Sequence, residues 1–151
     1  SILDNGSIVV LHKIRKGPFI DFAKQEELFS KQSSKMRVKM DSAEDLITRL
    51  SGGNQQKVVL AKWLMSNPKV LILDEPTKGI DVGSKSEFYQ MICRFAKQGL
   101  GVILISSELP AVIGLSDRII VMRGRKVSGE VMREDATEQK LLSLAMIEED
   151  A

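Results

Sequence analysis

Seven consecutive residues, Val70 to Pro76, restrict the possible folds of this chain more than any other stretch. They read Val-Leu-Ile-Leu-Asp-Glu-Pro, which is four apolar residues followed by two acids. A short unbroken apolar run predicts a buried strand, whose C-terminal end lies at the edge where α/β sheets bind ligands. Asp74 is suited to hold Mg²⁺ through water, and Glu75 could orient or deprotonate an attacking water. The alternative is an acidic strand end that only caps the following turn.

The segments around this stretch predict an α/β fold, with helices covering a parallel sheet. Asp21 is a candidate N-cap for the first long helix, Gly99 a C-terminal stop, and Asp135 with Glu138 a capping box. Residues 37–50 are polar and irregular. Helices are predicted at 22–36, 53–66, 84–98, 108–113 and 137–147, and strands at 70–73, 102–105, 118–122 and 127–131. The strands at 70–73 and 102–105 are expected to be buried.

A second motif, Leu-Ser-Gly-Gly-Asn-Gln-Gln at 50–56, immediately precedes the predicted helix at 53–66. Gly52 and Gly53 let the backbone approach a ligand closely, and Ser51 supplies a hydroxyl. A helix N-terminus with its N–H groups and positive dipole end is suited to bind an anion. The alternative is a helix-capping serine followed by flexible glycines.

The composition excludes several other classes of protein. One cysteine among 151 residues rules out a disulfide framework and multi-cysteine metal sites, and one histidine argues against histidine-based catalysis. A net charge of +2 gives no support to a nucleic-acid-binding surface. No apolar run approaches the roughly 18 residues of a membrane span, and no signal peptide is recognisable. A reducing cytoplasmic setting is expected.

Taken together, three motifs in this order resemble the ATP-binding domains of ABC transporters. They are Leu-Ser-Gly-Gly-Asn-Gln-Gln at 50–56, Leu-Ile-Leu-Asp-Glu-Pro-Thr at 71–77 and Gly-Ile-Asp at 79–81. The first is similar to the signature loop, the second to the Walker B strand with its catalytic glutamate, and the third to the D-loop. The resemblance implies part of a RecA-like P-loop NTPase core, with a parallel sheet and a terminal hairpin, plus the ABC helical subdomain.

Further stretches resemble one subfamily, the second ATP-binding domain of bacterial monosaccharide importers of the ribose, galactose and xylose type. These stretches are Gly-Gly-Asn-Gln-Gln-Lys-Val at 52–58, Gly-Ile-Asp-Val-Gly-Ser-Lys at 79–85, Ile-Ser-Ser-Glu-Leu-Pro at 105–110 and Ser-Asp-Arg-Ile-Ile-Val-Met at 116–122. The resemblance covers nearly the whole chain.

The resemblance assigns a role to each matching position. Asp74 and Glu75 would serve an ATP bound to their own domain, with Asp74 as the Mg²⁺ residue and Glu75 as the catalytic residue. Asp81 would carry communication between domains. The γ-phosphate side of an ATP held mainly by the opposite domain would be contacted by Ser51, Gly52, Gly53 and Gln55.

Two departures from the family pattern matter. The chain has no Gly-x-x-x-x-Gly-Lys-Ser/Thr, so the phosphate-binding loop is missing from this sequence. In the family this loop and the Q-loop lie upstream of residue 1, so we expect a truncated domain that is inactive alone. Ser107 stands where most ABC ATPases have the switch histidine, and a serine offers no imidazole. We therefore expect slow hydrolysis, or a mainly structural ATP site; the alternative role of Ser107 is a helix N-cap.

The expected organisation is a helical signature subdomain over residues 1–66 and the C-terminal half of the RecA-like core over 67–151. In the family the phosphate-loop strand lies between the strands at 102–105 and 118–122. Without it, two sheet edges would be exposed. We expect the chain either to rearrange so that this gap closes or to self-associate through these edges.

The resulting hypothesis is an ATP-hydrolysing subunit that powers sugar uptake at the cytoplasmic face of the bacterial inner membrane. The resemblance implies ATP and Mg²⁺ as cofactors. It also implies three partners: the N-terminal ATP-binding domain of the same polypeptide, transmembrane permease subunits and, indirectly, a periplasmic or surface sugar-binding protein. No nucleic-acid partner is expected. The alternatives are a nucleoside importer of the same family, a soluble ABC-type ATPase without a transport role, and a non-catalytic interaction module.

Overall fold

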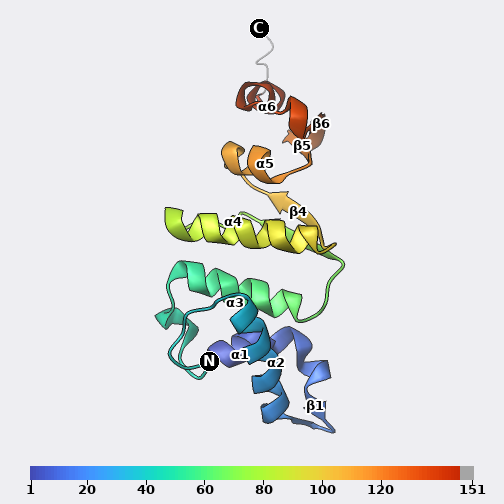
Figure 1. Ribbon diagram of the computed structural model, residues 1–151. Coiled ribbons are helices and arrows are strands. Elements are labelled where there is room, and N and C mark those ends of the chain that lie inside the picture. Colours follow the sequence, from blue (N-terminus) through green and yellow to red (C-terminus); the bar gives the residue numbers. More distant parts are fainter. Residues whose placement is uncertain (147–151) are drawn as a thin grey trace. The chain divides into compact units, whose positions relative to one another are not determined.

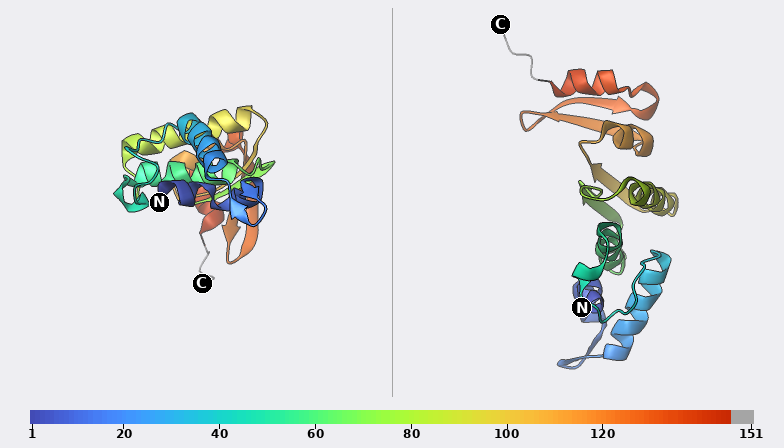
Figure 2. Two further views of the ribbon diagram at one scale, coloured as in Figure 1. Left: turned by 90° about the horizontal axis from the view of Figure 1, so that it is seen from below. Right: turned by 90° about the vertical axis from the view of Figure 1, so that its left-hand side faces the viewer.

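The structure, a computed structural model, describes residues 1–146 and falls into two compact units (Figures 1 and 2). Unit 1 comprises residues 1–71 and 76–102, and unit 2 comprises residues 72–75 and the chain from Ile103 onward. Among the helices of residues 1–146, none is both long and apolar enough to cross a membrane.

The N-terminal part of unit 1 is a helical assembly, coloured blue to green in Figure 1. It consists of α1 (Ile2–Ser7), the 3-10 helix η1 (Ile8–Lys13), a hairpin of β1 (Arg15–Lys16) and β2 (Phe19–Ile20), α2 (Phe22–Lys35), η2 (Ile47–Arg49) and α3 (Gly52–Leu64). The helices predicted at 22–36 and 53–66 are confirmed within two residues at each end. Asp21 caps α2 as predicted, because its Oδ1 accepts the N–H of Lys24 at 3.1 Å.

The core of this assembly surrounds one aromatic ring. Phe29 of α2 is 1% exposed and belongs to a cluster with Ile2 and Leu3 of α1 and Val58 of α3. Gly6 of α1 lies directly against the ring: a Cβ at this position would lie 3.2 Å from Phe29 Cζ and closer still to Cδ2 and Cε2. The two helices therefore approach too closely for any side chain at position 6.

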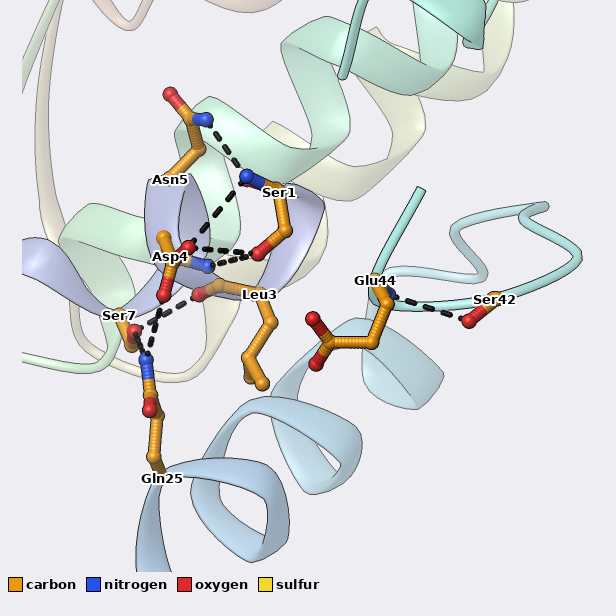
Figure 3. Close-up of polar contacts among 8 residues, drawn as sticks. All are labelled: Ser1, Leu3, Asp4, Asn5, Ser7, Gln25, Ser42 and Glu44. Atoms are coloured by element: carbon orange, nitrogen blue, oxygen red, sulfur yellow. Dashed lines mark hydrogen bonds and ion pairs between the residues drawn. The ribbon is translucent and has the colours of Figure 1, made fainter. Parts of the chain in front are cut away.

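A buried polar contact accompanies this core between α1 and α2 (Figure 3). Gln25 is 2% exposed, and its Nε2 donates to Ser7 Oγ at 2.8 Å and to Asp4 Oδ1 at 3.3 Å. Ser7 Oγ in turn donates to the carbonyl of Leu3 at 2.8 Å. Hydrogen bonds from the Ser1 hydroxyl and from Gln25 hold the pKa of Asp4 below its usual value. These bonds satisfy Gln25 Nε2 and the Ser7 hydroxyl, which would be costly to bury alone, whereas Gln25 Oε1 is buried without a partner among the described residues.

The strands β3 (Val70–Asp74) and β4 (Gly101–Ile105) form a two-stranded sheet. The Gly101 N–H donates to the carbonyl of Lys69 at 2.9 Å, and the Glu75 N–H donates to the carbonyl of Ile105 at 2.9 Å. Bonds at equivalent ends of both strands show that they run parallel, as predicted. This register places residues 72 and 103 side by side.

The prediction that these two strands are buried is only half right. Leu71 is 7% exposed, whereas Val70, Ile72, Ile103 and Ile105 are between 48% and 63% exposed. Successive side chains of a strand point to opposite faces. The exposed residues are alternate ones, so they form one apolar face of the β3–β4 sheet, and the opposite face is the covered one.

The helix α4 (Val82–Lys97) follows β3 in the chain and belongs to unit 1. It begins two residues before the predicted start because Asp81 caps it. Phe88, Met91 and Ile92 are its buried residues. The helix ends at the expected glycine: Gly99 has a φ of +94°, a backbone conformation that residues with a side chain rarely adopt.

Unit 2 contains the predicted C-terminal hairpin and two helices (Figure 2, orange and red). Its elements after β4 are α5 (Leu109–Leu115), β5 (Arg118–Arg123), β6 (Lys126–Met132), the 3-10 helix η3 (Arg133–Asp135) and α6 (Glu138–Ala145). The strands β5 and β6 pair antiparallel, with Ile119 opposite Val131. These two residues and Leu141 of α6, which is 2% exposed, form the core of unit 2.

One prediction for this region is corrected by the structure, and another is narrowed. Asp135 does not cap the last helix, because it belongs to η3; the cap is Thr137, whose Oγ1 accepts the N–H of Lys140 at 3.2 Å. Residue 147, the predicted end of this helix, lies outside the described residues. Of the two outcomes expected for the sheet edges, closing of the gap is not seen within residues 1–146, where β4 pairs with β3 and β5 with β6 in separate sheets. Self-association through these edges stays a prediction.

Candidate functional site

The two acids of the Val70–Pro76 stretch lie at the C-terminal end of β3, as predicted. Asp74 is exposed and Glu75 is half-buried. Glu75 has a φ of +43°, in the left-handed region, which costs an ordinary residue about 1–2 kcal/mol. Two hydrogen bonds to the end of β4 hold this conformation: the Glu75 N–H donates to the Ile105 carbonyl at 2.9 Å, and Glu75 Oε1 accepts the N–H of Ser107 at 2.7 Å.

Ser107 therefore contacts Glu75 through its main chain. The alternative role predicted for it, the N-cap of the next helix, is wrong: the N-cap of α5 is Glu108, whose N–H donates to Ser106 Oγ at 3.1 Å. The hydroxyl-bearing residue that stabilises this turn is thus Ser106, one position earlier. A backbone N–H donating to a carboxylate is a charge-assisted bond, stronger than one between neutral groups.

The donor set at the end of β3 fits a magnesium ion. Mg²⁺ is commonly held by one or two carboxylates, with waters and substrate phosphates completing its octahedron. Asp74 offers one exposed carboxylate of this kind. Within residues 1–146 no group of three or more histidine, cysteine or acidic side chains could enclose a metal ion.

The Leu-Ser-Gly-Gly-Asn-Gln-Gln motif lies at the N-terminus of α3 in unit 1. Ser51 is the N-cap residue, but its side chain does not cap the helix; its Oγ instead accepts a hydrogen bond from Asn54 Nδ2 at 3.0 Å. Ser51 and Gly52 are exposed. Gln55 is half-buried and donates from Nε2 to the carbonyl of Leu50 at 2.9 Å. The first N–H groups of a helix have no partner within it, so this exposed end can receive an anion.

Gly53 differs from its neighbour because it is buried. A Cβ on Gly53 would lie 2.8 Å from both Cβ and Oγ of Ser84, in the first turn of α4. The second glycine of the motif is thus required by the packing of α3 on α4. The sequence pattern predicts either close approach to a ligand or a flexible glycine after a capping serine, and neither includes this packing.

Asp81 caps the N-terminus of α4, where its Oδ1 accepts the N–H of Ser84 at 2.9 Å. This hydrogen bond is the main cause that holds the pKa of Asp81 below its usual value. The carboxylate is exposed and remains ionised at neutral pH. Its structural role as a cap is one that the sequence reasoning did not assign.

Two further polar pairs near these motifs were not predicted. Lys57 Nζ lies 2.7 Å from Glu87 Oε2, and Thr77 Oγ1 lies 2.8 Å from the hydroxyl oxygen of Tyr89. Lys57 could have been suspected, because it lies four residues after Gly53 on the apolar stripe of α3. Its partner, on a helix 30 residues away, leaves no signal in the local pattern.

The comparison with known families decides the classification. Residues 3–78, half of the chain, match the family model described as ABC transporter. The chain belongs to the ABC transporter family. The match includes two of the three motifs expected of an ABC protein, the signature-like motif and the end of β3; the D-loop-like Gly-Ile-Asp at 79–81 lies just beyond it.

Known ABC proteins resemble this chain in sequence and in fold. The chain is 49% identical, over 95% of its length, to a xylose import ATP-binding protein of Geobacillus kaustophilus, and 47% identical, over 97%, to a ribose import ATP-binding protein of Mesorhizobium japonicum. An arabinose import ATP-binding protein of Mannheimia succiniciproducens is 58% identical over 78% of the chain. These alignments span only 24–29% of the relatives' lengths.

The fold comparison agrees with this classification. The structure of a metal-chelate type ABC transporter in an inward-facing conformation matches 95% of the chain with a TM-score of 0.81, at 18% identity. A bacterial ABC transporter cassette solved as a dimer matches 88% with a TM-score of 0.74, at 21% identity. These matches cover 57% and 56% of the two solved chains. At such identities they establish the α/β cassette fold alone.

Proposed function

We propose that this chain is part of the ATP-binding and ATP-hydrolysing protein of an ABC transporter that imports a simple sugar across the bacterial inner membrane. Support comes from relatives named as xylose, ribose and arabinose import ATP-binding proteins, at 47–58% identity. The partners would be permease subunits in the membrane, an N-terminal ATP-binding domain on the same polypeptide and, indirectly, a sugar-binding protein. The protein would lie at the cytoplasmic face of the membrane.

The observation that carries the proposal is the fixed position of Glu75. Its carboxylate is held at 2.7 Å by the Ser107 N–H, and its backbone by the Ile105 carbonyl. A carboxylate fixed beside an exposed Asp74 can accept a proton from, or orient, a water that attacks the γ-phosphate. Asp74 would hold Mg²⁺ through water, and the ion would neutralise charge on the phosphates.

Ser107 also explains how such a site can lack a histidine. The contact with Glu75 needs only a main-chain N–H, which a serine supplies as well as any other non-proline residue. A histidine side chain would add a contact to the γ-phosphate. The absence of a histidine side chain at this position fits a site that binds ATP and hydrolyses it slowly.

The exposed start of α3 would act on a second ATP. Ser51 and Gly52 present a hydroxyl and helix N–H groups, and Gly53 and Gln55 complete the motif that contacts the γ-phosphate of an ATP held by the opposite domain. Asp81, exposed at the start of α4, would communicate between the domains. The loop that gives most of the phosphate affinity is not in these 151 residues, so the chain alone is expected to lack ATPase activity.

The test is a Glu75→Gln substitution in the full-length protein assembled with its permease. We expect ATP hydrolysis and sugar uptake to be lost while ATP binding is kept, because glutamine cannot accept the proton. Glu138→Gln, which changes an exposed acid at the start of α6 in the same way, is the matched control and should leave both activities unchanged. Full activity in Glu75→Gln would refute the assignment.

A titration of the chain with Mg-ATP tests the assignment of Ser51 and Asp74 to two different ATP molecules. Calorimetry of Mg-ATP with the 151-residue chain should give no detectable heat of binding. One-to-one binding would reveal a phosphate site among residues other than those named here, and the assignment of Ser51 and Asp74 to different ATP molecules would have to be abandoned.

A further inference from the structure

The helices α3 and α4 are joined by an ion pair with one buried member. The Lys57 side chain is 6% exposed, and its Nζ lies 2.7 Å from Glu87 Oε2; the Glu87 side chain is 40% exposed. The same Nζ lies 3.4 Å from the carbonyl oxygen of Arg37. A buried ammonium needs a partner of opposite charge, since burying it unpaired is far more costly than burying a neutral group. The Glu87 carboxylate supplies that partner, so the two helices are held at this point.

A second contact lies one turn nearer the two N-termini. Gly53 packs against Ser84 so closely that a Cβ would lie 2.8 Å from the serine. Lys57 follows Gly53 by four residues and Glu87 follows Ser84 by three, which is one helical turn in each case. The two contacts therefore lie one turn apart along both helices, within the first two turns of α3 and α4, and they fix both the spacing and the register of the helices.

Both helices begin at residues that the proposed function uses. The motif at 51–55 starts α3, and Asp81 caps α4. All of these residues belong to unit 1. Any change in the register of the two helices would move one of these ends relative to the other.

We propose that Lys57 and Glu87 are positioning residues, which hold the start of α3 and Asp81 in fixed register so that both act on the neighbouring ATP-binding domain as one element. The proposal rests on the function proposed above. It adds that the pair acts on turnover, through position, without touching ATP.

Lys57→Met is the informative variant. It removes the buried charge and keeps a side chain of similar length, while the Glu87 carboxylate, 40% exposed, can be hydrated. The variant is therefore expected to fold. Replacing Glu87 would instead leave a buried ammonium with only the Arg37 carbonyl. Lys62→Met, on the same helix with its ammonium over the Trp63 ring, is the matched control, and Lys57→Arg is the conservative variant that keeps the charge.

The first measurement follows the register directly. Spin labels at Val59 on α3 and Ser86 on α4, both exposed, with Cys93 and any other cysteines replaced by serine, report the distance between the helices by electron paramagnetic resonance. In the full-length protein without nucleotide, we expect one narrow distance distribution for the parent, Lys62→Met and Lys57→Arg. We expect a broadened or shifted distribution for Lys57→Met. An unchanged distribution in Lys57→Met would overturn the proposal, whatever the ATPase does.

The second measurement is ATP turnover by the same proteins in the assembled transporter. We expect kcat to fall about tenfold or more in Lys57→Met with ATP affinity unchanged, and to return in Lys57→Arg, because a misplaced start of α3 and Asp81 would weaken their action in the transition state and not the binding of ATP. A broadened distance distribution together with normal ATP turnover in Lys57→Met would also overturn the proposal, provided that Glu75→Gln abolishes activity. If Glu75→Gln stays active, the proposed function fails, and with it the role in turnover; the distance distribution then decides only whether the pair sets the register.

Discussion

Gly6 provides the sharpest test of the packing in unit 1. Replacing glycine by alanine inside a helix usually adds stability, by about 1 kcal/mol. Here the new Cβ would fall inside the contact distance of two ring atoms of Phe29, a side chain that is 1% exposed and has no room to move. Overpacking of this kind costs about 1–3 kcal/mol, and a wholly buried ring places the cost near the upper end. The net expectation for Gly6→Ala is a loss of about 1–2 kcal/mol in the free energy of unfolding.

The assay is urea unfolding followed by circular dichroism, with two companion variants. Gly114→Ala, in α5, is the control: its Cβ would meet no atom within 4 Å, so the change should be neutral or stabilising. In a Phe29→Leu background, where the ring is gone, Gly6→Ala should lose most of its cost, and the two changes should be non-additive. A Gly6→Ala protein as stable as Gly114→Ala would refute the close approach of the helices.

Three further predictions concern other parts of the chain. The pKa of Asp81 is lowered in the folded protein. The ionised Asp81 therefore contributes to stability above about pH 4, and this contribution is lost as the pH falls through the pKa of the folded protein. In acid titrations of unfolding, the difference in stability between the parent and Asp81→Asn should shrink as the pH falls below about 4. Ser107→Ala should keep the ATPase rate of the full-length protein, since only the main chain meets Glu75; a loss equal to that of Glu75→Gln would contradict this. Leu141→Ala should cost about 2–5 kcal/mol in thermal unfolding, and Leu142→Ala, 48% exposed, within about 0.5.

Much of the fold was predictable from local patterns. The helices at 22–35 and 82–97 both show a helical spacing of apolar residues, and the first also begins after the predicted capping aspartate, Asp21. The strand at 70–74 is an unbroken apolar run ended by charge. Each of these signals lies within one turn or one strand, so the sequence alone contains it.

Other features depend on residues far apart in the chain. The apolar runs do not predict that Ile72 and Ile103 are exposed, because an unbroken run does not show whether one face of the strand or both faces are covered. The hairpin β1–β2 has strands of two residues, too short for any period. The last helix is capped by Thr137 because the residues before it close a 3-10 turn that spacing alone did not reveal.

The candidate site was predictable in its acids and glycines but not in what holds them. Asp74 and Glu75 follow from the strand pattern, whereas the Ser107 N–H that fixes Glu75 is a main-chain group 32 residues away. Gly53 was predicted to lie close to a ligand, because glycine lets the backbone approach closely. In the structure, the group that lies against Gly53 is the Ser84 side chain. A glycine in a sequence indicates that another group comes close to the backbone, but it does not indicate which group.

The apolar face of the β3–β4 sheet has a consequence for the chain while the ribosome is still making it. About 30 residues separate Ile72 from Ile103, and a ribosome adding about 5–20 residues per second needs about 2–6 s to make them. During that interval the first strand has been made and its partner has not. A strand with an unpaired edge and uncovered isoleucine and valine side chains is a site where nascent chains adhere to one another. Until β4 has been made, β3 is therefore open to pairing with other nascent chains.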